Sequence, residues 1–190
     1  MTDKAYVAGV GMVPFQKPGK SESYDVMATA ATRSALADAG LDYDKVQQAY
    51  VGYVYGDSTC GQRALYHVGM TGIPVLNVNN NCSTGSSALF LARQAVESGA
   101  VECALALGFE QMQPGAIGAM FHDRVSPFAA FDNETDELVG SAEIPLALRY
   151  FGGAGKAHMD EFGTPLETFA KIRAKASRHA AKNPVALFRQ

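Results

Sequence analysis

The sequence predicts an α/β fold built on a mixed, mostly parallel sheet with covering helices. Between residues 5 and 109, short apolar segments of strand character alternate with longer segments whose apolar residues recur at helical spacing. A strand, a helix and a second strand in that order pair in parallel through a right-handed crossover. The chain has 190 residues, 47% of them apolar, which is enough for one large domain with an excursion.

The boundaries of these elements are marked by capping and turn residues. Ser23 is a candidate cap for a helix, and Gly40 and Gly99 are candidate helix ends. The predicted strands cover residues 5–11, 51–55, 75–81 and 101–109, and the predicted helices cover residues 24–39, 62–70 and 84–98. Every predicted strand after the first therefore follows a helix.

The sequence changes character after residue 109. Residues 110–140 are first rich in Gly and Pro and then acidic, which predicts a long connection, and such connections are often functional. Two helical stretches follow, over residues 144–162 and 164–182. We therefore expect two domains, an α/β domain over residues 1–109 and a second over residues 110–190.

Composition excludes several classes of protein. The net charge is −3, and Lys and Arg do not cluster with aromatic residues, which argues against a nucleic-acid or anionic-membrane surface. We expect no membrane span, because no stretch approaches about 18 apolar residues, and no secretory signal, because the N-terminal apolar run is too short. The three cysteines contain no C-x-x-C pair, so we expect no zinc site or disulfide framework and favour a reducing compartment such as the cytoplasm.

Most candidate motifs have an ordinary structural interpretation. Gly9 and Gly11 suggest a dinucleotide loop, but Pro14 takes the third glycine position, which favours a structural turn. Cys103 lies in a predicted strand and is expected in the core, whereas Cys60 fits a turn that lines a site or an interface as well as it fits a structural role. The histidines lack metal-binding or catalytic spacing, and we expect surface or structural positions for them: His67, His122 with Asp123 and Arg124, His158 and His179.

Cys82 differs from these candidates because it lies where an extended segment becomes a helix, in the stretch NVNNNCSTGSSALF (residues 77–90). Free N–H groups and the helix dipole stabilise negative charge there, which favours the reactive thiolate. Ser83 or Thr84 can cap the helix, and Gly85 leaves room for a substrate carbonyl. From the residues alone, a nucleophile and a buried structural cysteine both remain open.

The helix that follows Cys82 is apolar on more than one side. Leu89, Phe90 and Leu91 are consecutive and therefore lie about 100° apart around the helix. Such a helix needs neighbours on several sides, and we expect something outside this sequence to pack against it.

Four long stretches of the sequence resemble the thiolase family, and specifically the sterol-carrier-protein type of 3-ketoacyl-CoA thiolase. They are VGYVYGDSTCGQRALYH (51–67), GMTGIPVLNVNNNCSTGSSALFLARQ (69–94), ECALALGFEQM (102–112) and FGGAGKAHMDEFGTPLETFAKI (151–172). The resemblance implies the N-terminal half of a thiolase-like fold, with residues 110–190 as its loop domain. It also implies a dimer whose interface lies near the segment before Cys82.

The resemblance implies a reaction as well. Cys82 would accept an acyl group from a 3-ketoacyl-CoA, and CoA would remove it by thiolysis, so that CoA is a substrate and no cofactor is bound permanently. The N–H of Cys82 would help to hold an oxyanion, with Asn81, Ser83 and Gly85 as support around the nucleophile. This chemistry places the chain in fatty-acid or sterol side-chain degradation, in the cytoplasm of a bacterium or the peroxisome of a eukaryote.

The sequence also departs from the family pattern. Thiolases have two similar halves, and the second half supplies two histidines and a second cysteine that this sequence does not contain; His122-Asp123 does not match their context. We therefore expect the chain alone to be inactive in thiolysis, with the missing half supplied elsewhere or by a partner chain. The alternatives are a non-catalytic thiolase-like partner subunit and a component of a retro-aldolase that acts on a steroid side-chain CoA ester.

Overall fold

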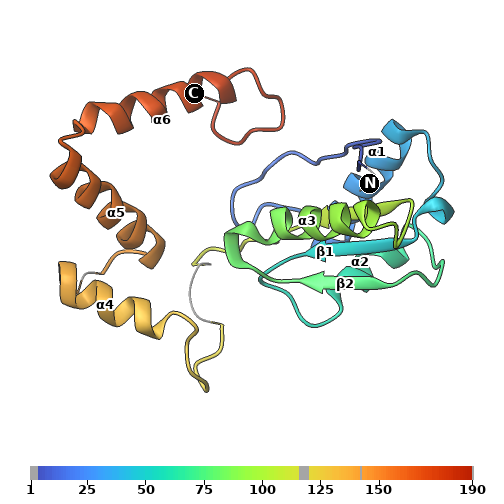
Figure 1. Ribbon diagram of the computed structural model, residues 1–190, viewed down its shortest axis with the longest axis horizontal. Coiled ribbons are helices and arrows are strands. Elements are labelled where there is room, and N and C mark those ends of the chain that lie inside the picture. Colours follow the sequence, from blue (N-terminus) through green and yellow to red (C-terminus); the bar gives the residue numbers. More distant parts are fainter. Residues whose placement is uncertain (1–3, 116–119, 142, 190) are drawn as a thin grey trace. The chain divides into compact units, whose positions relative to one another are not determined.

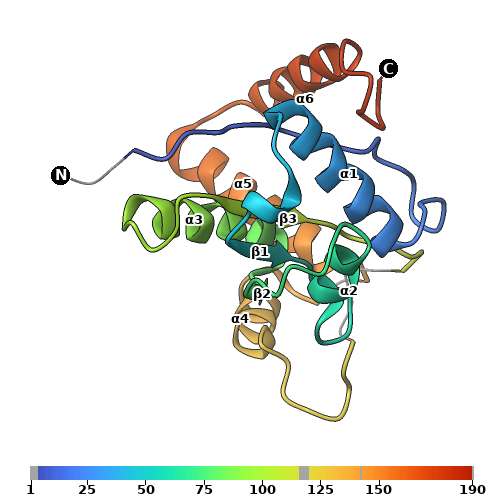
Figure 2. The same cartoon turned by 90° about the vertical axis from the view of Figure 1, so that its right-hand side faces the viewer.

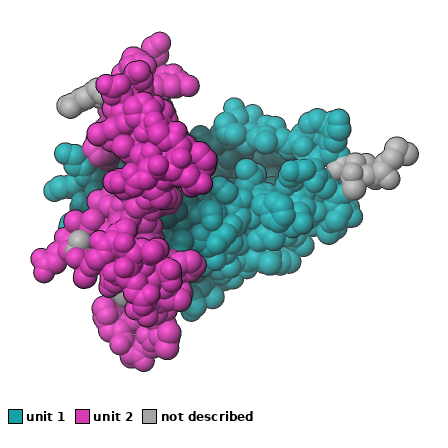
Figure 3. Space-filling model, turned by 60° about the vertical axis from the view of Figure 1, so that its left-hand side comes forward, with its two compact units in different colours: residues 1–114 teal, residues 115–190 magenta. Residues whose placement is uncertain are grey.

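The computed structural model describes residues 4–115, 120–141 and 143–189. The chain divides into two compact units, Met1–Pro114 and Gly115–Gln190, which Figure 3 shows in different colours. Each unit has its own helices.

The first unit contains a three-stranded parallel sheet in the order β2-β1-β3, of which Figure 1 labels β1 and β2. Its strands are β1 (Gln48–Gly52), β2 (Val75–Val78) and β3 (Ala104–Gly108). Tyr50 of β1 is in register with Leu76 of β2 on one side and with Ala106 of β3 on the other. The predicted α/β class with parallel pairing is confirmed.

Helices cover both faces of this sheet (Figure 2). On one face lie α1 (Tyr24–Ala39) and α2 (Cys60–Tyr66), and on the other lies α3 (Thr84–Glu97). Side chains alternate along β1, so that Ala49 and Val51 join the core beneath α1 and α2, while Tyr50 packs against α3. A strand buried on both faces is typical of parallel sheets.

The helix α3 packs on the sheet through its smallest side chains. Ala88, Ala92 and Ala95 recur at helical spacing, lie on the sheet side and are buried. Leu89 and Phe90 are both 57% exposed, so the predicted excess of apolar surface on this helix is present. These two side chains form an apolar face that the rest of the first unit does not cover.

The first correction in this unit concerns its N-terminal segment. Residues 5–11 form no strand: the N–H of Val10 donates to Asp38 of α1, and Gly9 and Gly11 lie directly against the backbone of α1. A Cβ on Gly9 would lie 2.5 Å from the carbonyl oxygen of Ala35, so only glycine permits this approach. The segment is extended as its composition predicts, but a strand also needs a neighbouring strand with which to pair.

The second correction concerns the helix caps. Gly40 ends α1 in the left-handed conformation, as predicted, with φ of 63°. Ser23 precedes α1 but makes no capping hydrogen bond, because its hydroxyl donates to the Asp25 carboxylate instead.

The bounds of two other elements differ from those predicted. The predicted strand over 51–55 is β1, which begins at Gln48 and ends at Gly52, and α2 begins at Cys60 rather than at residue 62.

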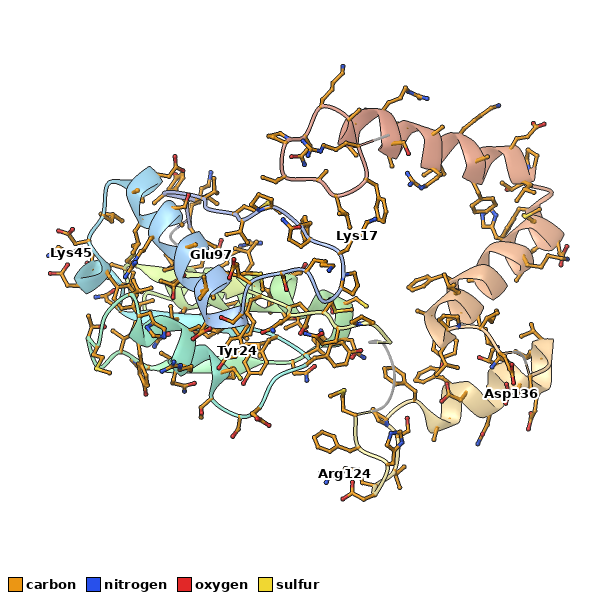
Figure 4. All side chains as sticks on the ribbon, turned by 180° about the vertical axis from the view of Figure 1, so that it is seen from behind. Lys17, Tyr24, Lys45, Glu97, Arg124 and Asp136 are labelled. Atoms are coloured by element: carbon orange, nitrogen blue, oxygen red, sulfur yellow. The ribbon has the colours of Figure 1, made fainter. Side chains whose placement is uncertain are left out.

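The second unit is helical, with α4 (Ala129–Val139), α5 (Leu146–Phe162) and α6 (Leu166–Ala180). The helix α4 corrects the prediction of an irregular connection over residues 110–140. Its acidic composition resembled a loop, but Arg149 of α5 lies buried against it and donates to Asp136 (labelled in Figure 4) and to the carbonyl oxygen of Gly140. None of the described helices is long and apolar enough to cross a membrane.

Candidate active site

The residues around Cys82 form a tight turn at the carboxyl edge of the sheet. The strand β2 ends at Val78, a single turn of 3-10 helix covers Asn81–Ser83, and α3 begins at Thr84. Asn81 has a φ of 46°, a left-handed conformation that asparagine adopts more readily than most residues. The predicted strand-to-helix junction at Cys82 is therefore present, with an additional helical turn in it.

Thr84 holds this turn together. Its hydroxyl accepts a hydrogen bond from the N–H of Asn80 and donates one to the carbonyl oxygen of Asn81. The side-chain amide of Asn80 donates a hydrogen bond to the hydroxyl of Ser87. The hydroxyl of Ser83 donates one to the backbone carbonyl oxygen of Asn80. Neither Ser83 nor Thr84 caps α3 in the predicted way, because both hydroxyls are used inside the turn.

Cys82 itself is exposed, which distinguishes it from the other two cysteines. Its thiol makes no hydrogen bond with any residue that the structure describes. Among the residues that the structure describes, the Cys82 side chain is therefore accessible, and its role as a nucleophile stays a prediction.

Glycines allow α3 to approach the sheet closely at this point. A Cβ on Gly52, the last residue of β1, would lie 2.7 Å from Cγ2 of Thr84. A Cβ on Gly108, the last residue of β3, would lie 3.6 Å from Cα of Gly85, which is an ordinary contact distance. A Cβ on Gly85 would meet nothing within 4 Å, so the space that the sequence predicted beside the nucleophile is open.

A second loop ends at the same edge of the sheet, and Glu110 holds it. The Glu110 carboxylate accepts hydrogen bonds from the N–H groups of Val54 and Tyr55, at 2.9 and 3.0 Å. These two residues follow β1, whereas Glu110 lies just beyond β3. Sequence reasoning missed this residue, and no local pattern in the sequence marks it.

Cys60 lies buried where this loop meets α2. Tyr24, Phe109 and Tyr53 stack in that order, with ring centroids 5.0 and 5.1 Å apart (Tyr24 is labelled in Figure 4). Burial and then a hydrogen bond with Cys60 raise the pKa of Tyr24 to about 12. A pocket of about 400 Å³ opens here, lined by Tyr24, Tyr55, Gly56, Asp57, Ser58, Thr59, Cys60 and Arg63.

Another pocket of the first unit lies elsewhere. It measures about 500 Å³ and is lined by Gln48, Tyr50, Leu91, Gln94, Ala95, Glu97, Ser98 and Ala100, near the end of α3 that is distant from Cys82. Neither of these two pockets includes Cys82. Of the two cysteines near the carboxyl edge of the sheet, Cys60 lines the smaller pocket but is buried, whereas Cys82 is exposed.

The other candidate residues occupy varied positions. His67 follows α2 and lies 3.4 Å from the Asp25 carboxylate, which also faces Arg63 at 3.5 Å. His158 is exposed and packs beside Phe162, as expected for a surface position. Cys103 directly precedes β3, so its assignment to the strand is wrong. Its side chain is half-buried, and this burial raises the pKa of its thiol.

The remaining candidate residues are exposed, as expected for a solvated connection. His122, Asp123 and Arg124 are exposed, and the Arg124 guanidinium (Figure 4) holds the pKa of Asp123 below its usual range. Within residues 4–115, 120–141 and 143–189, no group of three or more His, Cys, Asp or Glu side chains could hold a metal ion.

A parallel sheet with helices on both faces and an exposed cysteine at the start of one of them defines an open-sheet α/β protein with a candidate nucleophile at the carboxyl edge of the sheet. The N-terminal domain of thiolase matches residues 5–190, and the chain therefore belongs to the thiolase family. The sterol carrier protein 2 of Homo sapiens is 52% identical over 191 residues, which cover 97% of this chain and 34% of that protein. The resemblance to the sterol-carrier-protein type is thereby confirmed, and the chain spans about a third of the length of such relatives.

More distant comparisons agree on the fold. The benzoylsuccinyl-CoA thiolase subunit BbsB of Thauera aromatica is 32% identical over 190 residues, which cover 98% of this chain and 46% of that subunit. The solved structure of the Ltp2-ChsH2(DUF35) aldolase has a TM-score of 0.72 and 21% identity, and the match covers 97% of this chain and 45% of that chain. The thiolase-like fold is thus shared with proteins whose names give different activities.

Proposed function

We propose that Cys82 is the nucleophile of a thiolase reaction, in which an acyl group passes from a 3-ketoacyl-CoA to CoA. The observation that carries this proposal is the exposure of Cys82 on the turn that leads into α3. Free N–H groups at the start of a helix stabilise negative charge on a sulfur and on a substrate oxygen. Ligands of open parallel sheets bind at the carboxyl edge, where this turn lies.

The proposed reaction proceeds in two acyl transfers. The Cys82 thiolate attacks the 3-keto carbon, and the bond between carbons 2 and 3 then breaks, leaving an acyl-enzyme and the enolate of acetyl-CoA, which takes up a proton. The thiol of a second CoA gives up its proton and attacks the acyl-enzyme, which releases the shortened acyl-CoA and restores the thiolate. The N–H of Cys82, supported by Asn81, Ser83 and Gly85, would stabilise an oxyanion formed in these steps.

We propose that the base and the proton donor for these steps come from residues outside this sequence. No described residue bonds to the Cys82 thiol, and the sterol carrier protein 2 relatives are about three times as long as this chain. The exposed Leu89 and Phe90 of α3 would pack against the missing part or against a partner chain. The chain alone should therefore show little or no thiolysis.

Further features of the proposed function follow from the resemblance. CoA would be a substrate, with no permanently bound cofactor, and the protein would act in fatty-acid or sterol side-chain degradation. We also propose that the protein forms a dimer whose interface lies near the segment that precedes Cys82. The three free cysteines fit a reducing compartment, the cytoplasm of a bacterium or the peroxisome of a eukaryote.

A non-catalytic partner subunit is the second candidate, because the same apolar face of α3 fits an interface in either case. An aldolase component is the third, supported only by the likeness of fold to the Ltp2-ChsH2(DUF35) aldolase. The exposed Cys82 favours thiolase chemistry over both. If a Cys82→Ala protein, supplied with its partner, still cleaved a steroid side-chain CoA ester, the aldolase would replace our proposal.

The test is intact mass spectrometry of the chain after brief exposure to acetyl-CoA or acetoacetyl-CoA. We expect an acyl adduct on the wild type, none on Cys82→Ala, and unchanged adducts on the control variants Cys60→Ala and Cys103→Ala. An adduct that survives in Cys82→Ala would refute the assignment of the nucleophile. If the wild type forms no adduct, activation of the thiol requires the missing part, and the experiment is repeated with that part supplied.

A further inference from the structure

Asn80 lies at the centre of the turn that carries Cys82. The chain turns there from the end of β2 into α3 (Figure 1), and the backbone of Asn80, with φ of −149° and ψ of 47°, belongs neither to a strand nor to a helix. Its carbonyl oxygen accepts hydrogen bonds from the N–H of Ser83 at 3.1 Å and from the hydroxyl of Ser83 at 2.8 Å. Cys82 therefore lies on a short loop whose two ends, Asn80 and Ser83, are bonded to each other.

Two further hydrogen bonds connect Asn80 to α3 itself. The N–H of Asn80 donates to the hydroxyl of Thr84, the first residue of α3, at 2.8 Å. The side-chain amide of Asn80 donates to the hydroxyl of Ser87, the fourth residue of α3, at 2.9 Å. One hydrogen bond tolerates rotation about its own axis, whereas two bonds to different residues fix an orientation. Asn80 and the short loop are thus held at one angle to α3.

Both anchors of Asn80 lie on a well-packed part of α3. Thr84 is 5% exposed, and Ala88, which directly follows Ser87, is buried against the sheet. In contrast, Asn80 and Cys82 are exposed and belong to neither core cluster of the first unit. The direction of the Cys82 side chain relative to α3 therefore depends on the hydrogen bonds of Asn80 and not on core packing.

We propose that Asn80 is a positioning residue for Cys82, with Ser87 as its anchor on α3. This inference rests on the proposed function, because it takes Cys82 as the nucleophile. The N–H groups and the dipole at the start of a helix stabilise a thiolate only when the sulfur is held near them, since the effect falls off within one turn. A loop that is fixed at one angle to α3 keeps the sulfur there before a substrate binds, so that the reaction does not first have to orient it.

The test is the rate of alkylation of Cys82 by iodoacetamide in the full chain. Mass spectrometry of the peptide that contains Cys82 separates its reaction from those of Cys60 and Cys103. Asn80→Ala and Ser87→Ala should each slow the reaction at about pH 7 by about threefold, as expected for the loss of one exposed hydrogen bond. At about pH 10 the variants and the wild type should react alike, because the thiol is ionised in all of them. A change in access alone would alter the rate at both pH values.

Two comparisons separate positioning from a general loss of structure. The double variant, Asn80→Ala with Ser87→Ala, should be no slower than either single variant, because all three lose the same bond. Ser87→Thr keeps a hydroxyl at this position and should react at the wild-type rate. Ser86→Ala, an exposed substitution beside it, is the matched control and should also react as the wild type does. The midpoint of urea denaturation should stay close to that of the wild type in all these variants, because the bond is exposed.

Additive losses in the double variant, or an equal loss at both pH values, would overturn the proposal. Its failure also differs from a failure of the proposed function. If Asn80→Ala forms the acyl adduct on Cys82 as fast as the wild type does, the nucleophile stands and its positioning by Asn80 is wrong. If the acyl adduct survives in Cys82→Ala while the alkylation rates change as expected, Asn80 does position the thiol, and only the assignment of the nucleophile is wrong.

Discussion

The N–H of Asn80 donates a hydrogen bond of 2.8 Å to the hydroxyl of Thr84, and the same hydroxyl donates one of 2.6 Å to the carbonyl oxygen of Asn81. One side chain thereby joins the residues before Cys82 to the first residue of α3. Thr84 is only 5% exposed, so water cannot readily replace these bonds. The position of the proposed nucleophile thus depends on a buried hydroxyl two residues away.

The first prediction concerns this hydroxyl. Thr84→Val keeps the shape of the side chain but removes both hydrogen bonds of its buried hydroxyl, with the N–H of Asn80 and the carbonyl oxygen of Asn81, which should lower the free energy of unfolding by about 1–2 kcal/mol. Equilibrium denaturation in urea measures the change. Ser86→Ala, an exposed substitution on the same helix, is the control and should stay within about 0.5 kcal/mol of wild type. Equal stability of the two variants would show that the turn does not depend on Thr84.

The second prediction compares two glycines at the ends of neighbouring strands. Gly52→Ala should push the start of α3 away from the sheet, because the new Cβ would lie 2.7 Å from Cγ2 of Thr84 and 2.9 Å from its carbonyl oxygen. We expect a loss of about 1–3 kcal/mol in stability, typical of overpacking, and a changed rate of alkylation at Cys82. Gly108→Ala, whose nearest neighbour is 3.6 Å away, should have a much smaller effect on both measurements.

The third prediction concerns the second loop at the same edge. Glu110→Gln replaces one of two acceptor oxygens by an NH₂ group, so that either Val54 or Tyr55 loses its hydrogen bond. Hydrogen exchange at the amide that loses its acceptor should become about tenfold faster, which corresponds to about 1.4 kcal/mol. Glu102→Gln is exposed and serves as the control. Unchanged exchange in Glu110→Gln would mean that the backbone of the loop is held by other contacts.

The sequence predicts features that depend on neighbouring residues and misses those that depend on distant ones. The helix over 24–39, its end at Gly40 and the junction at Cys82 follow from local spacing and turn residues. The contact of Glu110 with Val54 crosses 56 positions and carries no local signal. Residues 5–11 show the same limit, because strand composition cannot say whether a partner strand lies alongside.

The helix α4 was missed for a related reason. Residues 129–137, AAFDNETDE, are polar and acidic, and helices of this composition gain little from intrinsic propensity. The helix is stabilised by α5, where Arg149 reaches Asp136 and Tyr150 donates to Asp132. Only the packing of the two helices, which no local window contains, separates this segment from a loop.

The fourth prediction follows from that contact. Arg149→Met keeps much of the side-chain volume, removes the buried charge and leaves the carbonyl oxygen of Gly140 without its donor. Breaking one side of a largely buried pair typically costs about 3–5 kcal/mol, but Asp136 is 47% exposed, so we expect about 1–2 kcal/mol. Amides of α4 should then exchange faster while those of α3 do not change. A uniform increase in both helices would argue against a local role for Arg149.

The last prediction is a pH dependence of stability that arises at Tyr24. The pKa of this tyrosine is raised from 10.0 to about 12, first by burial and then by its hydrogen bond with Cys60. Between about pH 10 and pH 12 the unfolded chain loses this proton while the folded chain keeps it, so stability should fall as the pH rises through that window. Tyr24→Phe retains the stack on Phe109 but has no proton to lose, and its stability should fall less steeply there. Urea denaturation at about pH 9 and about pH 11 tests this, with Tyr6→Phe, 83% exposed, as the control. An equal fall in all three proteins would assign the pH dependence to other groups.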